Sequence, residues 1–208
     1  MTSLTPLPIE AIEPTLAQYD AALALAPPVA RQVWHRIAAS RRHIGGDETS
    51  WHADAVDLCA VFGMNPIARS PQDSLSWDGH SVATRTEASV LIHEVAHFQL
   101  ASPARRFMPD FCLGAGPETG KIDYANGFLG LDTDRREIEE QRTSLLGVIW
   151  EAELGQPAIL AFQEQNWLEG AGRASTAAFF VDVLTTVIEM GLVDAEGRPL
   201  LALRCTAD

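Results

Sequence analysis

Cysteine pairs are missing from the sequence, which contains only Cys59, Cys112 and Cys205. The three are far apart and odd in number, and no Cys-x-x-Cys pair occurs. The chain therefore indicates neither a disulfide framework nor the paired thiolates that are typical of structural zinc sites.

Positive charge is also scarce, with 15 lysine and arginine residues against 28 aspartate and glutamate residues and a net charge of −13. Nucleic-acid-binding domains present a basic surface, so this balance excludes general nucleic-acid binding. The stretch Gly116–Lys121 superficially resembles a phosphate loop. Ala115 stands where the first glycine is required, however, and Ile122 replaces the serine or threonine after the lysine. We therefore expect no nucleotide site there.

Long apolar runs are lacking as well. The longest run in the N-terminal third, Ala21 to Ala26, is far too short to span a bilayer. The first six residues have neither the cationic start nor the apolar core of a secretory signal. We therefore expect a soluble, cytoplasmic protein with no membrane partner. Its 208 residues, 47% of them hydrophobic, are ample for one domain over residues 1–208.

Hydrophobic periodicity and breaking residues predict a mainly helical, single-domain α+β fold. The predicted helices cover residues 14–26, 29–42, 49–62, 80–102, 134–154 and 175–190. Apolar residues around the Asp78-Gly79 dipeptide predict a small β-hairpin over residues 75–82. Residues 1–13 are expected to be an extended lead. Residues 112–131 are expected to be a glycine-rich loop, either a lid or a plain surface loop.

One stretch organises the rest of the chain, the pattern His93-Glu94-x-x-His97. No glycine or proline interrupts residues 80–102, and Pro103 ends the run. Apolar residues point in every direction along this helix, which indicates that it is buried. The sequence thus predicts a buried helix of the kind found in zincins.

The spacing of the two histidines predicts a metal site. Residues four apart share a helix face, so His93 and His97 can reach one cation, at roughly 2.0–2.1 Å if it is zinc. Glu94 lies on an adjoining face, close enough to hydrogen-bond a metal-bound water. The alternative is a pair of core histidines that are satisfied by backbone carbonyls.

Two histidines leave the ligand set incomplete, and a carboxylate from a later helix is the usual completion. The predicted helix over residues 134–154 offers Glu137, Glu139 and Glu140. Periodicity alone does not choose among the three.

The stretch from Ile92 to Gly170 resembles the bacterial elongation factor P hydroxylase family. The residues that carry the resemblance are Ile92-His93-Glu94-x-x-His97, Ala101, Ala104-Arg105-Arg106, Asp110-Phe111, Pro117, Gly120, a glutamate on the next helix, Gly155, and the turn Asn166–Gly170. The resemblance covers under half of the chain. Most of its weight lies on the Ala-Arg-Arg and Asp-Phe elements, because unrelated peptidases share His-Glu-x-x-His.

The resemblance implies a ligand set and a chemistry. When Gly155 is set against the glycine of the family, Glu140 takes the carboxylate position, with Glu137 as the second choice. The implied activity is Fe(II)-dependent hydroxylation of a protein or peptide side chain, in that family a modified lysine on a translation factor. Arg105, Arg106 and Asp110 are then expected to contact the substrate.

The same residues also suit other functions. In a zinc metallopeptidase they would activate a water molecule, with Glu94 as the general base. A structural metal site in an interaction protein is a third possibility. Structural zinc sites usually close four protein ligands, however, and no fourth ligand is evident in the sequence.

Overall fold

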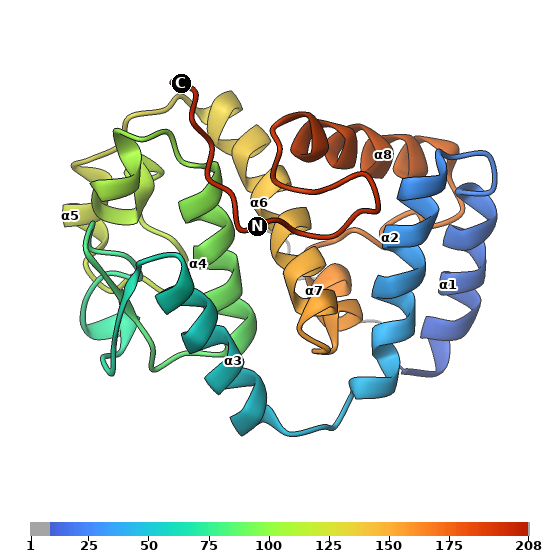
Figure 1. The fold of residues 1–208 in the computed structure, drawn as a ribbon, viewed down its shortest axis with the longest axis horizontal. Helices are drawn as coiled ribbons and strands as arrows, with labels where there is room; N and C mark the ends of the chain where they lie inside the picture. The colour runs from blue at the N-terminus through green and yellow to red at the C-terminus, as the bar shows by residue number, and fades with distance from the viewer. Residues whose placement is uncertain (1–8, 208) are drawn as a thin grey trace. The chain divides into compact units, whose positions relative to one another are not determined.

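The structure, a computed structural model, describes residues 9–207, with side chains from residue 13 onward. Its helices and strands follow in the order α1 (Ile9–Ala22), α2 (Pro28–Ala39), α3 (Glu48–Val61), β1 (Asn65–Ile67), β2 (Ser81–Ala83), α4 (Ala88–Leu100), α5 (Ile122–Asn126), α6 (Thr133–Glu153), α7 (Ala158–Glu164) and α8 (Ala174–Glu189). Four short 3-10 helices complete the order: η1 (Ser40–His43), η2 (Pro71–Asp73), η3 (Arg105–Phe107) and η4 (Pro109–Cys112). The prediction of a mainly helical fold with a small sheet is confirmed (Figure 1).

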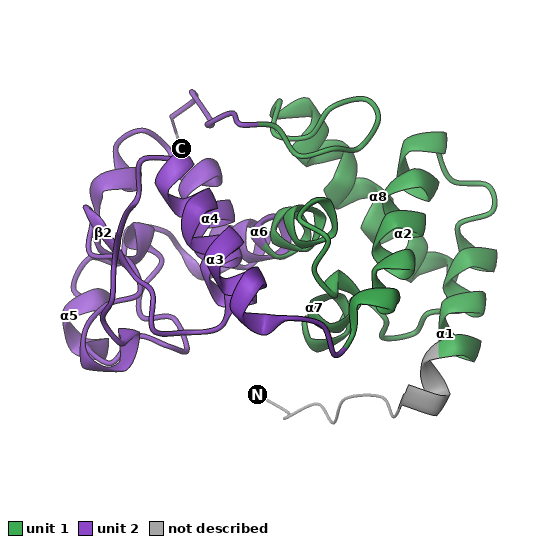
Figure 2. Ribbon diagram, turned by 60° about the horizontal axis from the view of Figure 1, so that its bottom comes forward, with its two compact units in different colours: residues 1–44, 144–200 green, residues 45–143, 201–208 purple. Residues whose placement is uncertain are grey.

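The described chain forms two compact units (Figure 2). Unit 1 contains residues 1–44 and 144–200, and unit 2 contains residues 45–143 and 201–208. Each unit is assembled from segments far apart in the sequence, and α6 contributes its first part to unit 2 and its last part to unit 1. The single domain over residues 1–208 stays a prediction.

Unit 1 is a helical assembly around an aromatic core. Tyr19 of α1 and Trp34 of α2 are buried, with their ring centroids 4.5 Å apart. Phe162 of α7 and Phe180 of α8 complete the cluster, both with edge-on contacts to Tyr19. These rings occupy the buried faces of their helices, so their contacts stabilise the unit beyond simple area burial.

Unit 2 contains α3 and α4, which pack against each other, and the two-stranded sheet. The sheet corrects the predicted hairpin, because β1 and β2 are parallel, with Asn65 opposite Ser81 and Ile67 opposite Ala83. The Asp78-Gly79 turn does form, and Trp77 makes a single antiparallel bridge to Val82. On the side away from Val82, the backbone N–H and C=O of Trp77 pair with Asp110, at 3.1 and 2.9 Å.

Helix α4 carries the His-Glu-x-x-His pattern. It begins at Ala88, eight residues later than predicted, because residues 81–83 extend the sheet instead. Its end at Leu100, just before Pro103, agrees with the prediction. The predicted burial is confirmed for most of the helix, since Leu91, Ile92 and residues 95–100 are all buried.

The two predicted irregular segments differ from expectation. Residues 1–8 of the predicted lead lie outside the described residues, and the chain is helical from Ile9. The predicted loop over residues 112–131 is interrupted by the five-residue helix α5. Among the helices that the structure describes, none has the length and apolar character needed to cross a membrane.

Candidate metal centre

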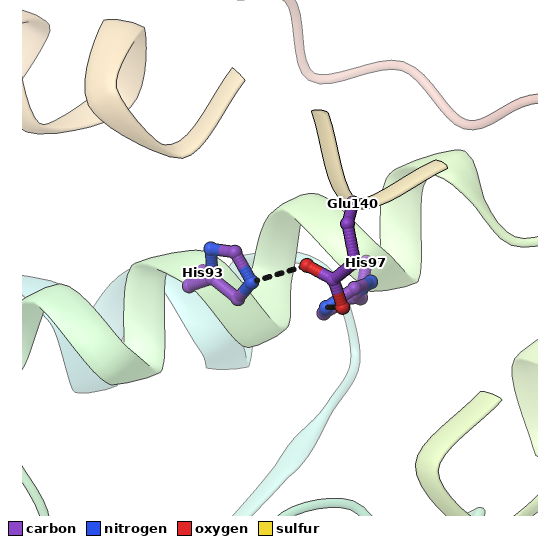
Figure 3. A group of neighbouring side chains, drawn as sticks. All are labelled: His93, His97 and Glu140. Carbon is purple, nitrogen blue, oxygen red and sulfur yellow. Dashed lines mark ion pairs between the residues drawn. The ribbon is translucent and has the colours of Figure 1, made fainter. Parts of the chain in front are cut away.

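His93, His97 and Glu140 lie together in unit 2 (Figure 3). The histidines sit one turn apart on α4, and Glu140 reaches them from α6. One oxygen of Glu140 lies 3.4 Å from Nε2 of His93, and the other lies 3.4 Å from Nε2 of His97. The two imidazole rings are nearly perpendicular, with centroids 4.7 Å apart. All three side chains thus direct ligating atoms toward one point.

These distances fit a cation better than direct hydrogen bonds. A charge-assisted hydrogen bond between nitrogen and oxygen is usually about 2.7–2.9 Å long. The two 3.4 Å contacts involve different oxygens of Glu140, and one potential ligand atom from each of the three side chains lies within 4.8 Å of the others, which leaves room for a metal ion between them.

His93 supports the same interpretation. Its Nδ1 is buried and has no hydrogen-bond partner, and its Nε2 has only the long contact to Glu140. A buried polar group without a partner is costly. A cation on Nε2 would satisfy that nitrogen, whereas Nδ1 would stay without a partner among the described residues.

His97 is held on two further sides. Its Nδ1 lies 3.2 Å from the hydroxyl of Thr143, a fully buried residue one turn after Glu140 on α6. The ring of Phe111 stacks on the imidazole at 5.6 Å, and Trp77 stacks on Phe111 at 5.8 Å. An Nδ1–H that donates to Thr143 leaves the Nε2 lone pair for a metal, the arrangement that orients ligating histidines.

The charges of the centre also suit a cation. Burial lowers the pKa of His93, which keeps this imidazole neutral. Burial also opposes the charge of His97, but Glu140 and Glu94 outweigh it and raise the pKa of His97 to about 9. The two histidines in turn hold the pKa of Glu140 well below its usual range, against the effect of burial. Without a metal the centre therefore holds a proton on His97, which a cation would displace.

Glu94 follows His93 on α4 and is not part of the group of His93, His97 and Glu140; its predicted role beside a metal stays a prediction. It is partly exposed on α4. Burial raises the pKa of Glu94 to about 8, and the nearby carboxylates of Asp110, Glu140 and Glu118 act in the same direction against His97. Glu94 is thus surrounded by carboxylates, and a group of carboxylates attracts a cation.

The choice among the three glutamates is set by the rotation of α6. Glu139 is buried and makes a two-pronged ion pair with Arg105, at 3.0 and 2.6 Å. Successive helix residues point about 100° apart, so with Glu139 fixed on Arg105 the next residue, Glu140, faces the histidines. Glu137 is exposed and lies outside the cluster. The structure therefore places next to the two histidines the carboxylate that the resemblance selects.

The expected substrate contacts of Arg105, Arg106 and Asp110 stay a prediction, and all three residues are buried. Arg105 binds Glu139 and the carbonyl of Phe111. The guanidinium of Arg106 donates to three backbone carbonyls, those of residues 98, 101 and 204. Asp110 accepts from Trp77 N and from the Thr119 hydroxyl. These interactions hold residues 105–112 in place beside His97.

Sequence reasoning missed the turn at residues 110–112. Asp110, Phe111 and Cys112 have φ angles of 38°, 53° and 61°, three successive residues in the left-handed region. Such a conformation costs about 1–3 kcal/mol per residue and persists where the surroundings enforce it. Only Asp110 has a residue type that favours it, so no residue pattern predicts the turn that places Phe111 against His97.

Comparisons with protein-family models, with curated proteins and with solved structures found no match to this chain. The functional argument therefore depends on the site itself.

Proposed function

We propose that the protein is a metal-dependent enzyme, a non-haem Fe(II) hydroxylase that acts on a side chain of a protein or peptide. The observation that carries the proposal is the cluster of His93, His97 and Glu140, whose potential ligand atoms lie within 4.8 Å of one another. Two histidines and one carboxylate are the ligand set of non-haem Fe(II) oxygenases, in which the remaining positions stay open. The chemistry that a bound ferrous ion supplies is the activation of dioxygen for oxygen insertion into a carbon–hydrogen bond.

The exposure of the cluster supports catalysis over a purely structural metal. Among the described residues, the cluster holds three potential ligands, one fewer than the four that close a structural zinc site. The Glu140 side chain is 52% exposed and that of His93 is 25% exposed, while His97 is buried. One side of the cluster is therefore accessible to small molecules, and the other is anchored in the protein.

An open hollow provides a place for a substrate. It has a volume of about 490 Å³ and is lined by Arg85, Thr86, Glu87, Val90 and Glu118. Val90 lies three and four residues before His93 and Glu94, so the three share one side of α4. Glu118 also acts electrostatically on Glu94. The hollow is thus adjacent to the face of α4 that carries the ligands.

The zinc metallopeptidase is the second candidate, because two histidines and a carboxylate beside the partly exposed Glu94 suit activation of water. The sheet argues against it. Zincin-like peptidases commonly bind substrate backbone along a sheet edge. In the described chain β1 is the outer strand, and Asn65 and Ile67 hydrogen-bond toward β2. The residue that points outward is Pro66, which has no N–H to donate. An extended peptide therefore gains little by pairing there.

Metal analysis of anaerobically purified protein, followed by oxygen-uptake assays with Fe(II) restored, tests the proposal. We expect about one iron per chain and Fe(II)-dependent oxygen consumption. Replacement of His93, His97 or Glu140 by alanine should abolish stoichiometric binding, whereas Glu137→Ala, the matched exposed control, should bind as wild type. Retention of the metal in Glu140→Ala together with its loss in Glu137→Ala would refute the ligand assignment.

The variant Glu94→Gln separates the two enzyme classes. A zinc peptidase needs this carboxylate as proton acceptor, and general-base assistance is worth about 10²–10⁴-fold in rate. Oxygen insertion does not require a water molecule to be deprotonated. We therefore expect Glu94→Gln to keep the metal and to retain measurable Fe(II)-dependent oxygen uptake. Peptide cleavage by the zinc-bound wild type, without oxygen uptake on any protein substrate tried, would overturn the hydroxylase proposal.

A further inference from the structure

A second, smaller cavity lies in unit 2 and shares no residue with the candidate metal centre or with the hollow beside it. Its volume is about 260 Å³, and it is lined by Arg69, Ser74, Leu75, Asp78, Lys121 and Tyr124. The lining comes from the segment after β1, the end of η2, the turn before β2 and the start of α5. Four separate segments therefore converge on it.

The cavity is lined by a net positive charge in a protein of net charge −13. Lys121 is the only lysine of the chain, and its ammonium has no hydrogen bond or ion pair within the described residues. The one acidic lining residue, Asp78, is already occupied. It accepts from the backbone N–H groups of His80 and Ser81 and from Arg69. Asp78 thus balances the charge of Arg69, and Lys121 gives the lining its net positive charge.

Asp78 fixes the position of Arg69, but not every nitrogen of its guanidinium has a hydrogen-bond partner in the described chain. One terminal nitrogen donates to Asp78 at 3.0 Å, which fixes the guanidinium. Its Nε is buried and has no hydrogen-bond partner among the described residues. Because this Nε is closed to solvent, an anion in the cavity would meet the terminal nitrogens of the guanidinium instead.

The position of Lys121 is set by an unusually close approach of two backbones. The N–H of Gly120 points to the carbonyls of Pro71 and Ser74, at 3.0 and 3.1 Å. A Cβ at Gly120 would collide with the carbonyl oxygen of Gln72, so only glycine fits. The stretch Gly116–Lys121 is therefore no phosphate loop, because its backbone donor is spent on η2. Its function here is to bring the lysine to the cavity.

We propose that this cavity binds an anionic group, a carboxylate or a phosphate, with Arg69 and Lys121 as its cationic partners. The ring of Tyr124, which is 55% exposed, and the buried side chain of Leu75 provide an apolar surface for the rest of the ligand. Side chains rather than a glycine-rich backbone would hold the anion. The site is independent of the metal centre and stands whether or not the hydroxylase proposal is correct.

The single lysine makes the test direct. Reductive methylation with formaldehyde modifies accessible amines, and mass spectrometry of the Lys121 peptide gives the rate at that one side chain. We expect inorganic phosphate or acetate to slow the modification of Lys121, whereas sodium chloride at equal ionic strength does not. The more protective of the two probes identifies the anion class. Equal rates in phosphate, acetate and chloride would refute the proposal.

Calorimetric titration of variants with the same probes supplies the second arm. Loss of one charge-assisted hydrogen bond should weaken binding about tenfold or more in Arg69→Gln and in Lys121→Gln. Lys121→Arg should retain most of the affinity, and Arg31→Gln, an exposed cation of unit 1, should bind as wild type. If Arg69→Gln does not fold, Lys121→Gln alone decides the outcome. Wild-type affinity in Lys121→Gln, or loss of binding in the metal-site variant Glu140→Ala, would overturn the assignment.

Discussion

At the scale of single residues, the candidate centre depends on Thr143 as well as on the three ligating side chains. The Thr143 hydroxyl is the partner of His97 Nδ1, at 3.2 Å, and it is buried where no water replaces it readily. Partners of this kind fix the tautomer and direction of a ligating imidazole, and their loss typically costs about 10–100-fold in metal affinity.

We therefore expect Thr143→Val, which keeps the shape and removes the hydroxyl, to weaken metal binding about 10–100-fold. Competition with a chromophoric chelator measures the change. The matched control is Thr185→Val, since Thr185 is exposed on α8 and bonds only a carbonyl of its own helix. An affinity that is the same in Thr143→Val and in wild type would mean that His97 is oriented by Phe111 alone.

The residues of the centre differ in how far the sequence revealed them. His93, Glu94 and His97 form a local pattern whose helical spacing is sufficient to predict a shared face. Glu140 comes from another helix, and periodicity left it equal to Glu137 and Glu139. What distinguishes them is the burial of Arg105 against Glu139, a long-range contact that no local pattern encodes.

At the scale of elements, the Arg105–Glu139 pair joins η3 to α6. Both side chains are only 8% exposed, and Arg105 also donates to the carbonyl of Phe111 in the left-handed turn. One guanidinium thus fixes the rotation of α6 and the position of Phe111 together. Buried ion pairs add little net stability compared with apolar residues, but breaking one partner leaves a buried charge without compensation.

Arg105→Met should therefore lower the free energy of unfolding by about 3–5 kcal/mol. The double variant with Glu139→Leu should recover most of that loss, because no unpaired carboxylate then remains inside. Urea denaturation of the two single variants and the double variant measures both effects. A double variant that is no more stable than Arg105→Met would contradict a role for the unpaired charge.

The sheet shows why the strands were harder to predict than the helices. Helices α6 and α8 begin and end within one residue of the predicted bounds, because their periodicity extends over many turns. The turn in the predicted hairpin is correct, but the pairing of the strands depends on residues that are far away in the sequence. Asp110 binds the backbone of Trp77, and β1 takes the other side of β2. Three-residue strands carry too little periodicity to reveal this.

At the scale of the whole molecule, the two units are each discontinuous in sequence. Hydrophobic periodicity predicted the helical class, but the grouping of residues 9–44 with residues 144–200 depends on nonlocal packing. The aromatic cluster of Tyr19, Trp34, Phe162 and Phe180 contributes much of it. Each of these residues is recognisable as core by itself, but nothing local states which of them meet.

A buried carboxyl group in unit 1 makes global stability depend on pH. Glu151, in the last turn of α6, is 4% exposed. Burial and the neighbouring Glu164 raise its pKa from 4.5 to about 8. The folded state therefore keeps a proton that the unfolded state loses above pH 4.5. Stability contributed by this group is present at low pH and declines between pH 4.5 and about 8, by about 1.4 kcal/mol per pH unit.

We expect Glu151→Gln to flatten that decline and to be more stable than wild type at pH 8 but not at pH 4.5. Thermal unfolding across this pH range measures it. Glu189→Gln, an exposed carboxylate change on α8, should keep the wild-type profile. Parallel curves for wild type and Glu151→Gln would show that this carboxyl group ionises freely in the folded protein.

Metal removal should also act on the whole molecule, because a cation that binds only the folded state adds stability by mass action. At a free metal concentration 100 times the dissociation constant the gain is about 2.7 kcal/mol. For a chain of this size each kcal/mol shifts the melting temperature by about 2–4 °C, so chelation should lower it by about 5–10 °C. Glu140→Ala, which lacks the shared carboxylate, should melt at the same temperature with and without chelator. If verified metal loss leaves the melting temperature of the wild type unchanged, the three side chains are not coupled to the folded core through a metal.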